Sequence, residues 1–142
     1  MNAARTYDEL TRGFDWSIAE KELEYKDGDV LNIGWHCSDR ICKQGRGGKL
    51  ALIWEDFRGV EKRYTFDDVR QYSNGIAAYL QRLGVQPGDR VCLFMDKVPE
   101  LYIGFLAVLK LGAIAQPLFS AFGEEALLTR LDNAQTTAIF TQ

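Results

Sequence analysis

The sequence predicts an α/β fold: a partial parallel sheet with βαβαβ crossovers, preceded by N-terminal helices and a β-hairpin. Two observations predict it. Apolar runs alternate with helical stretches in the last third of the chain, which is the order of strands and crossover helices in a parallel sheet. Before them, two strand-like segments are separated by a short turn, which is typical of a hairpin. The runs span 90–95, 113–118 and 136–142, the helices 99–111 and 124–131, and the hairpin strands 50–56 and 61–66.

The first third predicts two helices. Asp15 is a good N-cap because its carboxylate can accept free backbone N–H groups, and the helix that follows it ends before the turn at 26–29. Asn32 is the next N-cap, and an apolar residue at every fourth position extends that helix to Gly45. That stripe consists of Ile33, Cys37 and Ile41.

The hairpin leads directly into a long amphipathic helix. Thr65 and Asp68 resemble a capping box, with Asp in place of Glu. Apolar residues then keep helical spacing as far as Gly84, a typical left-handed helix terminator.

The parallel unit opens with the tight turn Pro87–Gly88 and a continuous apolar strand, of the kind buried on both faces of a sheet. Pro99 suits the first position of the following helix. That helix is apolar nearly all round, so we expect it to be deeply covered until Gly112 ends it.

The last strands and helix complete the pattern. Pro117 cannot donate to a strand ladder, so we expect the strand to leave the sheet there. Gly123 then caps a helix whose leucines face inward, namely Leu127, Leu128 and Leu131. The final strand follows without a neighbour or helix for its far side, so we expect a piece of a larger α/β protein. Residues 1–48 would form an N-terminal helical extension, and 49–142 the first part of a large domain.

Composition excludes several classes of function. The 142 residues carry a net charge of −3, and no basic stripe favours nucleic acid or an anionic membrane. No window reaches the length of a membrane span, and the N-terminus has no secretory apolar core. The three cysteines are odd in number and scattered, which indicates free thiols and a cytoplasmic location, with no metal site expected.

Candidate chemistry is sparse, and we assign no catalytic residue. The glycine-rich segment 44–49 follows a helix and precedes a strand, and Lys49 is followed by Leu, so it fails as a phosphate loop. Asp96 and Lys97 lie at the carboxyl end of a strand, where ligands gather, although a solvated pair is the better interpretation. His36, the one histidine, lies in an apolar helix and is a poor base candidate.

The segment 114–122 has an unusual junction, because two phenylalanines flank Ser120 and Ala121 where polar turn residues are ordinary. Either Phe119 and Phe122 pin the helix to the sheet, or they line a surface that something else covers.

Three segments together carry a family resemblance: YTF at 64–66, GVQPGDRV at 84–91 and LKLGAIAQPLF at 109–119. The chain resembles the N-terminal part of the acyl-adenylate-forming enzymes, and among them most the AMP-forming acetyl-CoA synthetases. The stretches WSIAEKELEY and LNIGWHCSDR resemble the N-terminal extension of that subfamily, so the likeness spans nearly the whole chain.

The resemblance implies a two-step ligase in the full-length protein. A carboxylate oxygen attacks the α-phosphate of ATP and releases pyrophosphate, and the thiol of coenzyme A then attacks the acyl carbon and releases AMP. ATP, Mg²⁺ and coenzyme A are thus the implied cofactors of the intact enzyme, with a small carboxylic acid such as acetate as substrate. The family's nucleotide-binding residues and catalytic lysine belong further along the sequence. The chain alone is therefore expected to bind no cofactor, to be inactive, and to self-associate through uncovered apolar surface.

The resemblance also points to a site. Where acetyl-CoA synthetases read Phe-Gly-Gly-Phe beside the coenzyme A entrance, this chain has Phe119, Ser120, Ala121 and Phe122. Phe119, Ser120 and Ala121 are the candidate coenzyme-site residues, with serine and alanine in place of glycines. Two alternatives stay open: a stand-alone α/β interaction or scaffold module without catalysis, or part of a fatty-acid or aryl-CoA ligase.

Overall fold

The computed structural model describes residues 6–142, and the chain divides into two compact units, residues 1–31 and 32–142. The first unit contains helices α1 (Tyr7–Arg12) and α2 (Trp16–Leu23). Thr6 and Glu9 form a capping box on α1, which the sequence analysis did not predict. Asp15 caps α2 as predicted, since its carboxylate accepts the Ser17 N–H at 2.9 Å. The proposed domain boundary after residue 48 concerns the whole protein and stays a prediction.

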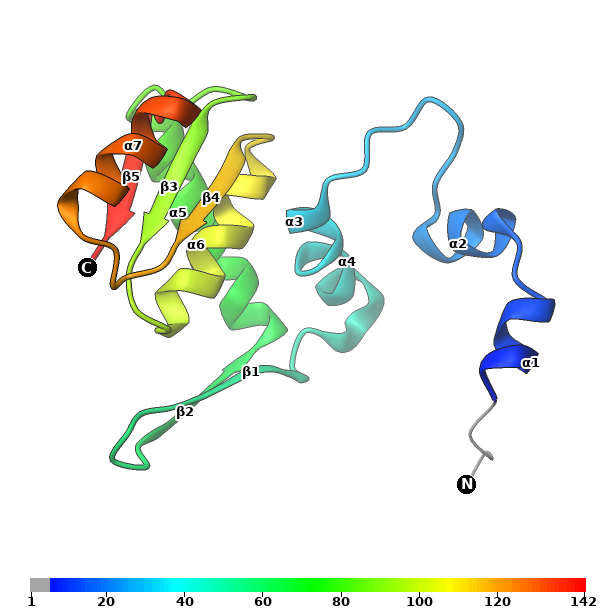
Figure 1. Ribbon diagram of the computed structural model, residues 1–142. Coiled ribbons are helices and arrows are strands. Elements are labelled where there is room, and N and C mark those ends of the chain that lie inside the picture. Colours follow the sequence, from blue (N-terminus) through cyan, green and yellow to red (C-terminus); the bar gives the residue numbers. More distant parts are fainter. Residues whose placement is uncertain (1–5) are drawn as a thin grey trace. The chain divides into compact units, whose positions relative to one another are not determined.

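The second unit holds the hairpin, the long helix and the crossover elements in the predicted order (Figure 1). Its elements are α3 (Ile33–His36), α4 (Asp39–Ile41), the π-helical turn η1 (Cys42–Arg46), β1 (Leu50–Glu55), β2 (Glu61–Thr65), α5 (Phe66–Arg82), β3 (Arg90–Phe94), α6 (Pro99–Lys110), β4 (Ile114–Leu118), α7 (Glu124–Ala134) and β5 (Ala138–Thr141).

The parallel sheet has the order β4-β3-β5, which confirms the βαβαβ prediction. The first crossover runs from β3 to β4, and the second runs back from β4 past β3 to β5, so right-handed connections place α6 and α7 on opposite faces. Figure 1 shows α7 on one side of the sheet and α5 and α6 on the other. In agreement, the Gln116 side chain donates to the Arg130 carbonyl in α7, whereas Leu93 faces α6 and packs near Gly104.

The core lies between the sheet and the α5–α6 layer. Its fully buried members come from β3 and α6, and Leu80 and Val85 close it at the end of α5. The core cluster consists of Leu80, Val85, Val91, Leu93, Val108 and Ala113. The capping box at Thr65 and Asp68 is confirmed, and so is the left-handed Gly84. Gly88 and Gly112 also have positive φ values, at the turn and at the helix end predicted for them.

The predicted helix from Asn32 to Gly45 is wrong as a single element. Asn32 is its N-cap as predicted, but the backbone breaks at Ser38, whose ψ is −72° and φ is −134°. The Ser38 hydroxyl donates to the Gly34 carbonyl at 2.6 Å, and such local bonding competes with the helical ladder. Gly45 takes a φ of 73° inside η1, which ends the segment.

Three further expectations need correction. Pro117 does not end its strand, because it pairs with Leu93 and the ladder continues through Leu118. The reason is that β4 has β3 as its one partner in residues 6–142, and a strand edge tolerates a missing N–H. Helix α6 is not covered all round, since Tyr102 stays 47% exposed, and Leu128 of α7 stays 52% exposed.

Candidate functional site: the carboxyl edge of the parallel sheet

The loops that follow β3 and β4 enclose a hollow of about 470 Å³ at the carboxyl edge of the sheet. This edge is where open α/β sheets bind ligands, because the loops after neighbouring parallel strands meet there. The hollow is lined by Met95, Asp96, Lys97, Leu101, Pro117, Leu118, Phe119 and Ser120.

Two hydrogen bonds hold the loop after β3. The Trp54 indole N–H of β1 donates to the Lys97 carbonyl at 2.7 Å, which attaches the hairpin to this loop. The Asp96 carboxylate accepts a hydrogen bond from the Gln142 side-chain amide at 3.2 Å. Pro99 then starts α6 at its first position, as predicted. Asp96 and Lys97 are exposed, as the interpretation of a solvated pair expects, yet both also line the hollow.

The loop after β4 is a turn in which the Phe122 N–H donates to the Phe119 carbonyl at 3.0 Å. Ser120 and Ala121 occupy its central positions, and neither has a positive φ, so the turn itself does not require glycine there. Serine and alanine therefore replace the glycines of the family pattern without backbone strain.

The two phenylalanine rings differ in role, and each fits one of the two interpretations given for them from the sequence. They meet edge to face, with centroids 5.9 Å apart and an interplanar angle of 89°. The Arg130 guanidinium lies 4.1 Å from the Phe122 centroid, so Phe122 is held against α7 by a cation–π contact. Phe119 is 64% exposed and borders the hollow. Phe122 therefore packs against α7, and Phe119 lines the hollow at the sheet edge.

The structure brings Phe119 and Ser120 together at the hollow, whereas Ala121 is exposed and lies outside its lining. Sequence reasoning missed the apolar walls that Met95, Leu101 and Leu118 supply. The available signal was their position at the ends of strands and at the start of α6, where side chains converge on one edge. An apolar hollow with one ammonium and one carboxylate is suited to binding rather than to breaking bonds.

Elsewhere in the described chain, the other candidate groups do not assemble a reactive site. His36 lies in α3, where its ring and the Trp35 ring meet edge to face. Its Nδ1 is buried without a hydrogen-bond partner. Burial raises the pKa of the Cys92 thiol. Within residues 6–142, no three His, Cys, Asp or Glu side chains gather where a metal ion could be held. In the same residues, no helix combines the length and apolar character that crossing a membrane requires.

The glycine-rich segment 44–49 is a helix-to-strand connection, as predicted. It joins η1 to β1 and lies outside the parallel sheet. A Cβ built on Gly47 would fall 2.3 Å from an oxygen of the Asp67 carboxylate, so an acid already occupies the space beside this loop. A phosphate there would meet a like charge, which excludes the phosphate-loop interpretation.

Comparisons with known proteins agree with this architecture. The chain is 41% identical to an acetyl-coenzyme A synthetase of Bacillus subtilis over 96% of its length, which is 24% of that relative. It is 34% identical to an acetyl-coenzyme A synthetase of Streptomyces coelicolor, covering 94% of this chain and 20% of that one. The chain thus spans about a quarter or less of the curated relatives that it matches.

Solved structures of related proteins match the fold of this chain. The crystal structure of an acyl-CoA synthetase from Brucella canis matches with a TM-score of 0.86 and 28% identity, over 97% of this chain and 25% of that one. The N-terminal subdomain of NpsA from Klebsiella oxytoca, in complex with 3-hydroxybenzoyl-AMSN, matches with a TM-score of 0.68 and 26% identity, over 79% of this chain and 27% of that one.

The family model described as AMP-binding enzyme matches residues 39–142, which include the hairpin, the parallel sheet and the hollow at its edge. On the agreement of this match with the fold and the relatives, the chain belongs to the AMP-binding enzyme family.

Proposed function

We propose that the chain is the opening part of an AMP-forming acyl-CoA ligase that uses acetate. The observation that carries the proposal is the 41% identity to an acetyl-coenzyme A synthetase over 96% of this chain, together with the TM-score of 0.86 to an acyl-CoA synthetase. In the intact enzyme, acetate and ATP form acetyl-adenylate and pyrophosphate, and coenzyme A then gives acetyl-CoA and AMP. The protein acts in the cytoplasm.

The hollow at the sheet edge borders the coenzyme A entrance in this proposal. Its features fit part of such a molecule: an exposed aromatic ring at Phe119, a hydroxyl at Ser120, and an ammonium at Lys97 whose charge is opposite to that of the coenzyme phosphates. Ala121, in the same turn, leaves the backbone approachable because its side chain is a single methyl group. Residues beyond this chain supply the contacts to ATP and Mg²⁺.

The chain by itself is inactive and self-associates in this proposal. Ile114 of β4 and Ile139 of β5 are 53% and 50% exposed, so the two edge strands carry apolar side chains that a larger protein would cover. Light scattering on the purified chain checks the self-association, and a monomer at all concentrations would contradict it.

Two alternatives have specific support. A fatty-acid or aryl-CoA ligase is favoured by the match to an N-terminal subdomain solved with an aryl-AMSN compound. A scaffold module without catalysis agrees with the finding that no three His, Cys, Asp or Glu side chains within residues 6–142 could hold a metal ion. The higher identity to acetyl-coenzyme A synthetases makes acetate the preferred substrate.

A chimaera tests the proposal. This chain replaces the matching segment of the Bacillus subtilis relative, and acetate-dependent pyrophosphate release from ATP is measured for the chimaera and for the chain alone. We expect activity in the chimaera and none in the chain. A folded chimaera without acetate-dependent activity would contradict the assignment, and pyrophosphate release by the chain alone would contradict its expected inactivity.

A further inference from the structure

Trp54 joins the hairpin to a loop that lies 43 positions further along the chain. Its indole N–H donates to the Lys97 carbonyl at 2.7 Å, within the normal range for such a bond. Trp54 also pairs with Lys62 across the hairpin, and the Lys62 ammonium lies 5.3 Å from its ring centroid. Figure 1 shows the hairpin on the side of the parallel sheet where β3 and β4 end. The indole is therefore held on both sides, by its own hairpin and by the loop.

The loop between β3 and α6 gains more from such an attachment than a capped helix start would. Val98 is the N-cap of α6, and its apolar side chain cannot accept the first N–H groups of the helix, whereas α5 begins with a capping box. Pro99 follows at the first helical position and has no N–H to donate. The Val98 N–H donates to the Asp96 carbonyl at 2.8 Å, which closes a tight turn within the loop. The Trp54 bond ties this turn to a different part of the fold.

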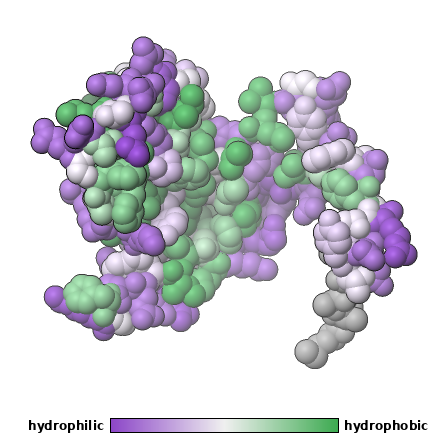
Figure 2. Space-filling model, in the orientation of Figure 1, coloured by the Kyte–Doolittle hydropathy of each residue, from purple (hydrophilic) through white to green (hydrophobic). Residues whose placement is uncertain are grey.

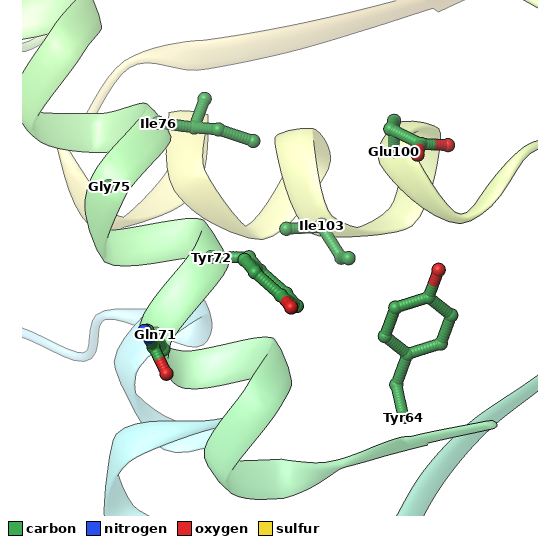
Figure 3. Close-up of a pocket in the computed structure, with 7 residues that line it drawn as sticks. All are labelled: Tyr64, Gln71, Tyr72, Gly75, Ile76, Glu100 and Ile103. Carbon is green, nitrogen blue, oxygen red and sulfur yellow. The ribbon is translucent and has the colours of Figure 1, made fainter.

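Side-chain packing does not replace this bond at the first turn of α6. A hollow of about 650 Å³ lies between β2, α5 and that turn. Figure 3 shows Tyr64 of β2 and Glu100 of α6 at its margin, with Tyr72 of α5 between the two helices. The hairpin itself packs on α5. On this side the hairpin and the first turn of α6 therefore stand apart, and the Trp54 hydrogen bond connects the hairpin to the loop directly.

The loop brings two charged residues to the hollow at the sheet edge. Asp96 and Lys97 both line it, beside Phe119 and Ser120 of the next loop. The Asp96 carboxylate accepts a hydrogen bond from the Gln142 amide. Within the part of the chain that the structure describes, the Lys97 ammonium takes part in no ion pair. Figure 2 shows hydrophobic side chains at the surface between the sheet and the hairpin, and beside an apolar surface an ammonium attracts an anion more strongly than in open water.

We propose that Trp54 is a positioning residue for the coenzyme A step. Its N–H fixes the Lys97 carbonyl, and so the backbone from which the Lys97 side chain extends. The Lys97 ammonium then meets a phosphate of the coenzyme, while Trp54 itself touches neither substrate nor coenzyme. Formation of the acyl-adenylate does not depend on this loop in the proposal. The inference rests on the proposed function, which puts the coenzyme A entrance at this hollow.

Trp54→Phe in the chimaera with the Bacillus subtilis relative removes the N–H and keeps an aromatic ring in β1. Two reactions are compared: acetate-dependent exchange of pyrophosphate into ATP, which needs no coenzyme, and acetyl-CoA formation at varied coenzyme A. We expect the KM for coenzyme A to rise about three- to tenfold, the factor that one neutral hydrogen bond is worth, and the exchange rate to stay within about twofold.

Lys62→Met is the matched control, because it removes the other contact of the same ring and keeps the N–H. Its KM for coenzyme A should stay within about twofold of the parent chimaera. An unchanged KM in Trp54→Phe overturns the inference. Equal losses in both reactions overturn it as well, because they indicate a general structural role.

A double-mutant cycle tests whether Trp54 acts through Lys97. Lys97→Met should also raise the KM for coenzyme A. Adding Trp54→Phe to Lys97→Met should raise the KM by no more than about twofold further, because the ammonium that the bond positions is already gone. Full, independent effects of the two substitutions would overturn the inference.

Hydrogen–deuterium exchange separates this inference from the proposed function. The peptide spanning 95–101 should exchange at least about threefold faster in Trp54→Phe than in the parent or in Lys62→Met. A folded but inactive chimaera overturns the proposed function. The exchange rate of 95–101 then decides the inference: a faster rate supports the positioning role and an unchanged rate overturns it. Should Trp54→Phe fold poorly, benzothienylalanine at position 54 repeats the experiments, since it keeps the two-ring shape and lacks the N–H.

Discussion

Breaking the Asp39–Lys110 ion pair is the perturbation for which the structure gives the clearest expected magnitude. The Lys110 ammonium of α6 lies 2.6 Å from the Asp39 carboxylate of α4, and their side chains are 9% and 17% exposed. The ammonium also donates to Ser73 at 2.8 Å and to Asn74 at 2.7 Å, both on α5. One cation thus joins three helices.

Lys110→Met keeps much of the apolar stem but leaves the Asp39 carboxylate without its cation. Removing one partner of a buried pair costs about 3–5 kcal/mol, whereas exposed pairs contribute about 1 kcal/mol or less. We expect about 3 kcal/mol, because Asp39 keeps the hydrogen bond from the Asn74 amide. That is a large share of the 5–15 kcal/mol typical of a domain.

The destabilisation caused by Lys110→Met should depend on pH in a defined direction. Burial acts to raise the pKa of Asp39, but the bonds and charge of Lys110 and the hydrogen bonds of Ser38 and Asn74 lower it on balance. A carboxylate with a lowered pKa stabilises the folded state above its unfolded pKa, and this contribution is lost as the pH falls through the folded pKa. The difference between wild type and Lys110→Met should therefore be largest near neutral pH and should shrink below about pH 4.

Urea unfolding followed by tryptophan fluorescence measures the effect. Arg70→Met is the matched control, because Arg70 forms an exposed pair with Asp67 at 3.1 Å, with side chains 45% and 52% exposed. Asp39→Asn combined with Lys110→Met should recover part of the loss, since no unpaired charge then stays buried. A cost for Lys110→Met that matches the control, or one that persists unchanged at pH 3, would refute the reasoning.

Two further predictions concern close contacts of α6. Gly104→Ala should destabilise the chain by about 1–3 kcal/mol in urea unfolding, because the new Cβ would lie 2.6 Å from the Phe140 ring. Gly75→Ala, where nothing lies within 4 Å, should be neutral or stabilising, and equal losses in both would contradict the packing argument. Asn32→Ala should cost about 1–2 kcal/mol, because Asn32 accepts the Trp35 N–H and its amide donates to the last carbonyls of α6. Asn32→Ser keeps an N-cap oxygen for the Trp35 N–H and should lose less; an equal loss would show that the α6 contact dominates.

The elements that sequence reasoning predicted well are those with strong local signals. The Thr65 box starts α5 and the glycine at 84 follows its end, as their capping chemistry indicates. The parallel sheet follows from the alternation of apolar runs with helices. These predictions depend on residues within a few positions of one another, so no tertiary contact was needed to make them.

The wrong predictions concern positions where a tertiary contact determines the local structure. The apolar stripe at 33, 37 and 41 predicted a continuous helix, yet Ser38 turns the chain there and presents Asp39 to the distant Lys110. Pro117 predicted a strand end. A proline is tolerated within β4 because β4 has one neighbouring strand among the described residues, and the local sequence does not encode that. The hollow combines the ends of two strands with the first turn of α6, so its lining could be predicted only by assembling the sheet first.

Residues 32–39 contact the carboxyl end of α6, which is the end away from the hollow at the sheet edge. Asn32 binds the Leu109 and Lys110 carbonyls, Asp39 binds the Lys110 ammonium, and a Cβ on Gly34 would fall 2.6 Å from the Leu106 carbonyl oxygen. All three fix the last turns of α6. The first turn of the same helix carries Leu101 into the hollow and follows the loop of Asp96 and Lys97. Because both ends belong to one hydrogen-bonded helix, we expect contacts at the carboxyl end of α6 to orient its amino end as well. The segment before the hairpin is therefore expected to position the candidate site without touching it.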